Sequence, residues 1–250
     1  MYRATKRGCF FGFKYREPKM KYTHGDCIKM KECLVNNFEF LEEDCHVMTD
    51  INLNDSDATM RSYEILQKIK DLMRLSKRRD TLVIYFSCHG FFDEKKRRCF
   101  MTAADGLAVD GNFHISMHPY IDLLNKYINC LFLITCADRA LIEQLKEIPR
   151  GCATTVIIDA CYGGGLAELA NELNSEDLVV YTACQPYQQS SGGNRGSVFT
   201  NSFVEFIEDN HDIVNDNVIR KLHLRFIGSG CLQTPGLTCV DSKLTSKIFL

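Results

Sequence analysis

Short apolar runs alternate along this chain with longer amphipathic segments, and this alternation restricts the possible folds more than any other feature. Apolar runs of this length predict buried strands, and helices between successive strands are typical of a mainly parallel sheet. The expected strands are Cys9–Phe13, Thr81–Ser87, Thr154–Asp159 and Leu178–Ala183, with weaker ones at Cys99–Thr102 and Lys247–Leu250. The expected helices are Asp26–Asn37, Asp57–Leu75, Asp138–Glu147, Ser197–Glu208 and Asn215–Arg225. We therefore expect an α/β fold, while residues 117–135 are ambiguous between helix and strand.

Composition and charge exclude several classes of protein. The chain has 250 residues, 45% of them hydrophobic, and no Gly/Ser-rich linker, so we expect one domain with one substantial core. Because 30 Lys and Arg balance 32 Asp and Glu, no global basic field favours a nucleic-acid partner. The apolar runs are too short to span a membrane, and the basic N-terminus lacks the apolar core of a signal peptide. These features predict a cytoplasmic monomer with no membrane partner.

Thirteen cysteines are scattered along the chain, an odd number that does not suggest a secreted disulfide framework. No Cys-x-x-Cys pair occurs, and His24-x-x-Cys27 and Cys45-His46 match no zinc-finger spacing. We therefore predict no metal site and expect most of the thiols to be reduced and buried as small apolar side chains.

Two of the expected strands end in turns that carry reactive side chains. Thr81–Ser87 is followed by Cys88, His89 and Gly90, and Thr154–Asp159 is followed by Cys161 and a glycine-rich turn. Ligands of open α/β sheets bind beyond the carboxyl ends of the strands. If the two strands are neighbours, His89 and Cys161 face one cleft.

A cysteine and a histidine in one cleft supply a nucleophile and its base. The thiolate attacks a carbonyl carbon, and the imidazole passes the thiol proton to the leaving amine. The backbone N–H groups of Gly90 and Cys161 are candidates for the oxyanion hole. The alternatives are a structural histidine and a packing cysteine, or a phosphate cradle at residues 163–165. The cradle is disfavoured because neither Gly-x-Gly-x-x-Gly nor Gly-Lys-Ser/Thr is present.

At these residues the sequence resembles the caspase-like cysteine peptidases, and among them the metacaspases. Asp159–Gly164 resembles the metacaspase Asp-Ser-Cys-His-Ser-Gly turn, and Tyr85–Gly90 resembles its Tyr-x-Ser-Gly-His-Gly segment. Thr182–Ser190 is similar to the Gly-Cys-x-Asp-x-Gln-x-Ser segment, and Gln233–Pro235 to a late Gln-x-Pro. Asp26–Met30 is in register with the early Asp-Ala-x-x-Met helix start. The resemblance therefore covers nearly the whole chain in the right order.

The resemblance implies a caspase-like fold, with a mainly parallel six-to-eight-stranded sheet and helices on both faces. It also implies that His89 is the base and Cys161 the nucleophile of an endopeptidase that cleaves after Arg or Lys. The substrates would be peptides or proteins with this basic residue at P1, before the cleaved bond. The implied S1 pocket comprises Asp26, Ser87 and Asp159, since paired carboxylates attract a cationic side chain.

Other interpretations of these residues stay open. Asp159 is alternatively a turn-capping residue, and Asp26 a helix N-cap. The same dyad could serve an Asp-specific, caspase-like peptidase. The chain is alternatively a catalytically silent caspase-fold protein that binds or regulates partners.

Many metacaspases need calcium, and the resemblance locates its ligands at positions where this chain departs from the family. Arg97 or Arg98 stands at the first position and Ile134–Asp138 at the usual Asp pair, while Glu168 alone keeps an acidic group. Calcium requires several oxygen ligands. We therefore predict that the calcium site is lost or weakened and that no cofactor is needed. Tyr162 and Pro186 also replace a family His and Asp, which affects the expected substrate preference.

By the same resemblance, residues 1–250 form one peptidase domain without a prodomain, with a larger part at about 1–172 and a smaller part at about 177–250. The link at 171–177 contains no Lys or Arg, so we expect no cleavage into two subunits there. Self-cleavage after a basic residue is instead expected, if at all, at Lys95–Arg98 or at Arg195.

Overall fold

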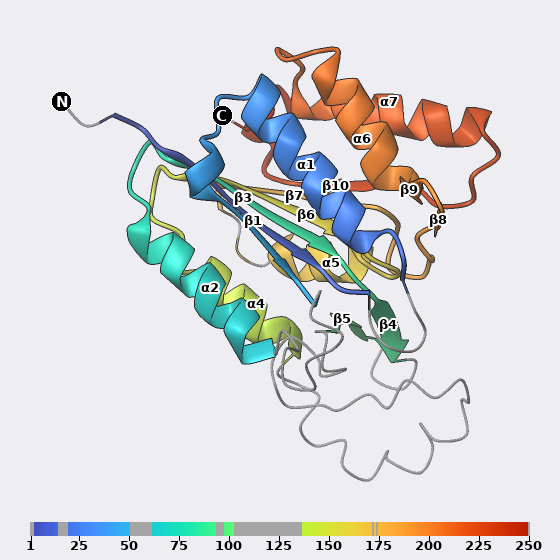
Figure 1. Ribbon diagram of the computed structural model, residues 1–250, viewed down its shortest axis with the longest axis horizontal. Coiled ribbons are helices and arrows are strands. Elements are labelled where there is room, and N and C mark those ends of the chain that lie inside the picture. The colour runs from blue at the N-terminus through green and yellow to red at the C-terminus, as the bar shows by residue number, and fades with distance from the viewer. Residues whose placement is uncertain are drawn as a thin grey trace, which may run out of the picture.

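A six-stranded sheet with the order β10-β7-β6-β3-β1-β2 forms the centre of the protein (Figure 1). The computed structural model describes residues 3–14, 20–50, 62–93, 98–102, 137–171, 173 and 175–249. Five strands of the sheet are parallel, and the short edge strand β10 is antiparallel to β7. The strands are β1 (Lys6–Gly12), β2 (Cys45–Thr49), β3 (Thr81–Ser87), β6 (Ala153–Asp159), β7 (Leu178–Thr182) and β10 (Gly236–Thr238).

Helices cover both faces of this sheet, as Figure 1 shows. One face carries α1 (Thr23–Asn37), α6 (Val198–Glu208) and α7 (Asn215–Gly228), and the other carries α2 (Ser62–Leu75), α4 (Ala137–Leu145) and α5 (Gly164–Asn171). Alternate residues of each strand enter opposite cores, because successive strand side chains point to opposite faces. In β3, Val83 and Tyr85 pack on the α1 side, whereas Leu82, Ile84 and Phe86 pack on the α2 side. Both faces are therefore apolar, which explains the nearly continuous hydrophobic runs.

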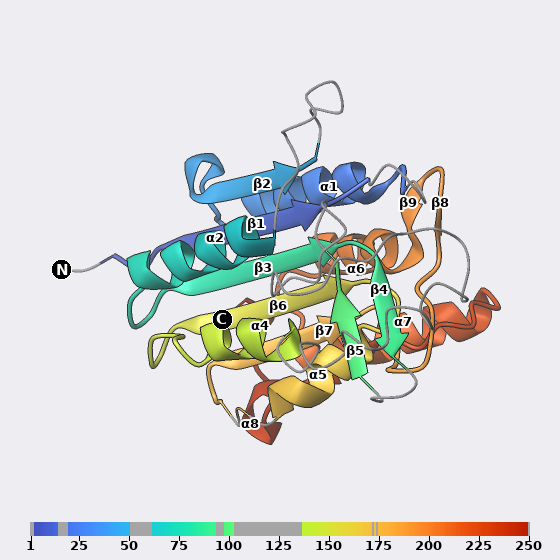
Figure 2. The same cartoon turned by 90° about the horizontal axis from the view of Figure 1, so that it is seen from below.

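The smaller elements lie around the sheet. They are η1 (Glu42–Asp44), α8 (Asp241–Leu244), the hairpin of β4 (Gly90–Asp93) with β5 (Arg98–Met101), and the short ladder of β8 (Gly192–Gly193) with β9 (Gly196–Ser197). Figure 2 shows the β4–β5 hairpin beyond the carboxyl end of β3. Among the described residues, no helix has the length and apolar character needed to cross a membrane.

The sequence-based expectation of the fold class is confirmed. The four stronger strands and the five helices are all present, with ends shifted by a few residues, and β3 has the expected bounds. Ser197 is the N-cap of α6 rather than its first residue, since its hydroxyl accepts hydrogen bonds from the backbone N–H groups of Phe199 (3.1 Å) and Thr200 (3.5 Å). The first residues of the helix expected from Asp57, and residues 117–135, lie outside the described part.

Two expectations about the sheet are wrong. The strand expected at Cys99–Thr102 pairs with β4 in the separate hairpin and does not join the main sheet. Of the closing strand expected at Lys247–Leu250, Lys247 forms a single bridge with Val214, residues 248–249 form a turn, and Leu250 lies outside the described part; β10 forms the edge instead. Sequence reasoning also missed β2, because an edge strand with half-buried side chains has only a weak apolar pattern.

Candidate active site

The reactive turns lie side by side because β3 and β6 are neighbouring parallel strands. Ser87 and Asp159 are partners at the ends of these strands. One residue further, the backbone N–H of Cys88 donates to the carbonyl oxygen of Asp159 (3.3 Å). His89 and Cys161 therefore follow adjacent strands at the same edge of the sheet, which meets the condition that the sequence analysis set for one cleft.

Gly90 brings the histidine turn against the cysteine turn. A methyl group at Gly90 would overlap the carbonyl oxygen of Cys161, so a side chain at this position would force the two turns apart. The carbonyl oxygen of His89 accepts a hydrogen bond from the backbone N–H of Thr102 (3.1 Å), which ties the histidine to the end of β5. Close backbone approach thus fixes the position of His89 and Gly90 beside Cys161.

The sulfur of Cys161 is half-buried, and the thiol points to the carbonyl oxygen of Ser190 at 3.9 Å. Burial raises the pKa of Cys161 above its usual value, and the nearby Asp159 carboxylate adds to this effect, while backbone hydrogen bonding to Ser190 opposes it. The thiol is therefore protonated near neutral pH and needs a base to become a nucleophile. The next residue, Tyr162, has φ of 60°, which turns the chain sharply after the cysteine.

Two buried carboxylates, here called the acidic pair, lie beside this cysteine turn. Asp159 is 3% exposed and accepts hydrogen bonds from the hydroxyls of Ser190 (2.9 Å) and Thr200 (2.6 Å). Asp26, which is 1% exposed, accepts from the backbone N–H of Ser197 (3.2 and 3.1 Å to its two oxygens). The two aspartates come from opposite halves of the chain, and α6 with its N-cap joins them.

Burial raises the pKa of both members of the acidic pair. The pKa of Asp26 rises to about 7, first because of burial and then because of repulsion by Asp159, with the Ser197 hydrogen bond and the charge of Lys29 opposing. The pKa of Asp159 is also raised by burial, against the hydrogen bonds that it accepts. Within the described part of the chain, neither aspartate forms an ion pair. Lys29 itself donates to the side-chain oxygen of Asn201.

The structure does not support the alternative roles of the two aspartates, a helix N-cap for Asp26 and a turn cap for Asp159. Helix α1 begins at Thr23, so Asp26 lies inside the first turn and bonds to Ser197 rather than capping the helix. The side-chain partners of Asp159 are 31 and 41 residues away in the sequence, so it is not a simple turn cap.

Ser87, the third residue expected in the S1 pocket, is fully buried opposite Asp159. Among the described residues, its hydroxyl has no hydrogen-bond partner. A buried polar group without a partner is costly, and such a group beside two uncompensated carboxylates is consistent with a site that receives a polar ligand.

Sequence reasoning missed four residues around the acidic pair: Ser190, Ser197, Thr200 and Tyr22. Ser190 was in a segment that carries the family resemblance, but nothing in the sequence linked Ser197 to Asp26 or Thr200 to Asp159. Tyr22 lies against Gly192, and burial together with the charges of Asp159, Cys161 and Asp26 raises its pKa. The residue before α1 therefore belongs to the same region.

The cysteine–histidine pairs considered as metal ligands have other roles. The ring of His24 bonds to the carboxylate of Asp50 (2.6 Å) in a buried pair, and His46 is exposed while Cys45 is buried. Among the described residues, no three His, Cys, Asp or Glu side chains are grouped as a metal site. Of the calcium-related positions, only Glu168 has a described side chain, which is exposed on α5. Arg98 belongs to β5 and Asp138 to α4, whereas Arg97 and residues 134–136 lie outside the described part.

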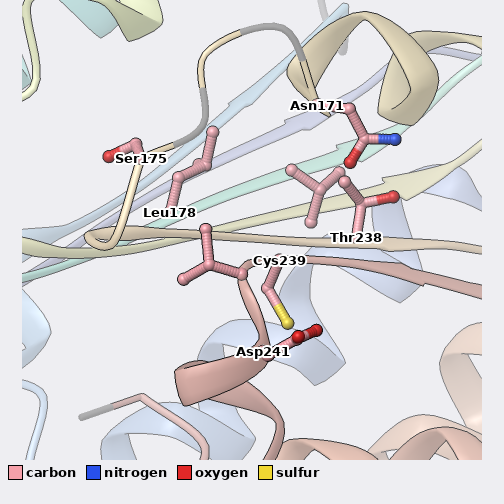
Figure 3. Close-up of a pocket in the computed structure, with 8 residues that line it drawn as sticks. Asn171, Ser175, Leu178, Thr238, Cys239 and Asp241 are labelled. Atoms are coloured by element: carbon pink, nitrogen blue, oxygen red, sulfur yellow. The ribbon is translucent and has the colours of Figure 1, made fainter.

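A pocket of about 380 Å³ lies elsewhere, at the β10 edge of the sheet (Figure 3). Leu178 and Val180 of β7, Thr238 of β10 and Asp241 of α8 contribute to its lining. None of the expected site residues lines this pocket, which separates it from the cysteine turn.

The family model of the caspase domain matches residues 10–248. The chain belongs to the caspase-domain peptidase family. Among curated proteins, this caspase domain is 28% identical to metacaspase-7 of Arabidopsis thaliana over 74% of the chain and 40% of that protein. It is 26% identical to metacaspase-1 of Schizosaccharomyces pombe over 58% of the chain and 30% of that protein. The caspase domain thus spans less than half the length of these relatives.

Solved structures show the same fold. Caspase-1 of Spodoptera frugiperda superposes with a TM-score of 0.58 at 17% identity, covering 98% of this chain and 88% of that one. A protein of Geobacter sulfurreducens gives a TM-score of 0.66 at 12% identity and covers 98% of both chains. The family match thus shows a caspase domain, and the named curated relatives are metacaspases.

Proposed function

We propose that this caspase domain is a cysteine endopeptidase that uses Cys161 and His89 to cleave peptide bonds after Arg or Lys. The observation that carries the proposal is the acidic pair, two buried carboxylates beside the cysteine turn that have no cationic partner among the described residues. A guanidinium or ammonium group between them would supply the missing positive charge.

In the proposed reaction, His89 takes the proton of the Cys161 thiol, and the sulfur attacks the carbonyl carbon before the scissile bond. The raised pKa of Cys161 makes this base necessary, because little thiolate forms without it. The backbone N–H groups of Gly90 and Cys161 would stabilise the oxyanion, and His89 would return the proton to the leaving amine. Water then hydrolyses the thioester and releases the new carboxyl terminus.

The proposed S1 pocket consists of Asp26, Asp159 and Ser87, with Ser190 and Thr200 orienting the Asp159 carboxylate. An aspartate at P1 would add a further negative charge to this buried acidic region. The pocket therefore favours Arg or Lys over Asp by electrostatics.

We also propose that the activity is independent of calcium. The support is the sequence, in which arginine stands at one calcium-related position and Glu168 is the remaining acidic group. We further propose that the enzyme acts as a cytoplasmic monomer on peptide or protein substrates; the cytoplasmic location is supported by the 13 scattered cysteines, which do not suggest a secreted disulfide framework.

Arg195 is exposed in the turn between β8 and β9, next to the acidic pair, and is a proposed site of self-cleavage. The Lys95–Arg98 alternative lies mostly outside the described residues. Intact-mass analysis tests both, and one unbroken chain with full peptidase activity would exclude self-cleavage as an activation step.

The proposed function is tested by the hydrolysis of two fluorogenic peptides that differ only in Arg or Asp at P1, with calcium and with chelator. We expect hydrolysis of the Arg peptide alone, equal under both conditions and abolished in Cys161→Ala. Hydrolysis of the Asp peptide would overturn the pocket assignment. Failure of both would favour a catalytically silent protein, and dependence on calcium would overturn the proposed independence.

A further inference from the structure

Three aromatic rings form a row that begins at the residue after Cys161. The ring of Tyr162 stacks on Phe92 of β4, with centroids 6.0 Å apart, and Phe92 meets Tyr187 edge to face at 5.0 Å. Tyr162 and Phe92 are half-buried, and Tyr187 is 60% exposed. This aromatic row presents a partly open apolar surface beside the nucleophile, although neither the dyad nor the acidic pair requires it.

The segment 187–190 contacts the aromatic row at one end and the cysteine thiol and the acidic pair at the other. At one end, Tyr187 contacts Phe92, and the carbonyl oxygen of Gln188 accepts from the backbone N–H of Tyr162 (2.8 Å). At the other end, the carbonyl oxygen of Ser190 faces the Cys161 thiol, and the Ser190 hydroxyl bonds to Asp159. An extended substrate with its basic side chain at the acidic pair would therefore continue past the sulfur toward the aromatic row.

The location of His89 indicates which end of the substrate meets the aromatic row. The base must return a proton to the leaving amine, so the part of the substrate after the scissile bond lies on the His89 side of the sulfur. Phe92 belongs to the hairpin that begins directly after His89, and at the end of the partner strand the backbone N–H of Thr102 donates to the carbonyl oxygen of His89 (3.1 Å). The aromatic row is therefore on the leaving-group side.

We propose that Tyr162, Phe92 and Tyr187 form a subsite for a large apolar side chain, aliphatic or aromatic, at the first or second residue after the scissile bond. This inference rests on the proposed endopeptidase function. Aromatic rings offer a large apolar area with few rotatable bonds, so contact with such a side chain costs little ordering. The side-chain amide of Gln189 reaches the hydroxyl of Tyr162 (3.5 Å) and helps to hold that ring.

The test uses internally quenched peptides with Arg at P1 and with Gly, Glu, Leu or Phe at each of the two following positions. The wild type is expected to cleave the best Leu or Phe peptide about fivefold faster in kcat/KM than the Gly peptide. In Tyr187→Ala this ratio is expected to fall below about twofold. The control variant Tyr63→Ala on α2 removes a ring that is 59% exposed, against 60% for Tyr187. This control is expected to keep the wild-type ratio between the Leu or Phe peptide and the Gly peptide. Tyr162→Asn is a second variant that is expected to lose the preference for Leu or Phe. Asparagine is chosen because it tolerates the positive φ at this position.

A P1-Arg methyl ester, whose leaving group is too small to reach the aromatic row, separates the subsite from the chemistry. Tyr187→Ala is expected to hydrolyse this ester at the wild-type rate. A wild type without preference for Leu or Phe, or a Tyr187→Ala variant that keeps this preference, would overturn the subsite while leaving the proposed function intact. A wild type that hydrolyses neither the ester nor the peptides would contradict the proposed function, and the subsite with it.

Discussion

Buried aspartates occur at both ends of the parallel sheet, but their surroundings differ. Asp80, directly before β3, is fully buried and forms an ion pair with the guanidinium of Arg7 at 2.9 Å. It also accepts hydrogen bonds from the backbone N–H groups of Thr5 (2.7 Å) and Lys77 (2.9 Å). At the carboxyl end, the acidic pair is equally buried, yet its partners are hydroxyls and a backbone N–H.

This difference distinguishes a structural carboxylate from a binding one. A buried charge is costly unless it is paired and hydrogen-bonded, and Arg7 pairs the charge of Asp80 within the fold. The acidic pair has only neutral donors, and burial raises the pKa of both its members. Uncompensated charge beside a reactive cysteine indicates that the missing cation comes from the substrate.

The largest expected effect is on substrate recognition in Asp159→Asn. This change keeps the shape of the side chain but removes the charge, so kcat/KM for a P1-Arg substrate is expected to fall about a thousandfold. The circular dichroism spectrum and the unfolding midpoint are expected to be retained. A variant with near wild-type kcat/KM for Arg would remove Asp159 from the proposed pocket.

The matched change at the other end, Asp80→Asn, is expected to affect stability instead. It leaves Arg7 without its buried partner, so the free energy of unfolding is expected to fall by about 3 kcal/mol. Urea titration measures this loss, and Arg7→Met in the same chain is expected to restore part of it. Equal losses of activity per folded molecule in Asp80→Asn and Asp159→Asn would erase the distinction between the two ends.

Compared with the wild type, the Asp26→Asn variant is expected to gain stability as the pH rises. Because the pKa of folded Asp26 is about 7, above its ordinary value of 3.8, the folded state keeps a proton that the unfolded state releases. Wild-type stability therefore decreases as pH rises through this window, and asparagine abolishes that loss. Between pH 5 and 8, the stability of the variant relative to wild type is expected to increase by about 2 kcal/mol. A constant difference in urea titrations would contradict the raised pKa.

The smallest expected effect is a pH dependence of P1 selection. Citrulline has nearly the shape of arginine without its charge, so the ratio of kcat/KM for P1 Arg to P1 citrulline cancels the titration of His89 and Cys161. As Asp26 ionises near pH 7, this ratio is expected to rise about tenfold from pH 6 to pH 8. A flat ratio would mean that the acidic pair does not meet the P1 side chain.

Local sequence patterns predicted the sheet core and the position of each reactive turn at a strand end, because buried strands have continuous apolar runs. That the two strands are neighbours came from the structure. Local patterns could not identify the environment of the acidic pair. Thr200 and Ser190 reach Asp159 from segments 41 and 31 residues away, which only the packing of α6 on the sheet brings together. Local rules assigned Asp26 to a helix cap, and only the family resemblance indicated a pocket.

The central claim, that Cys161 is the nucleophile and the acidic pair selects a basic residue, is tested most directly with two peptidyl ketone probes that alkylate thiols. The probes differ only in Arg or Asp at P1, and mass spectrometry of the intact and digested protein locates the adduct. The Arg probe is expected to add once, at Cys161 among the 13 cysteines, and not to Cys161→Ala, while the Asp probe leaves the protein unmodified. Labelling of Cys161 by the Asp probe, or labelling of other cysteines alone, would contradict the account.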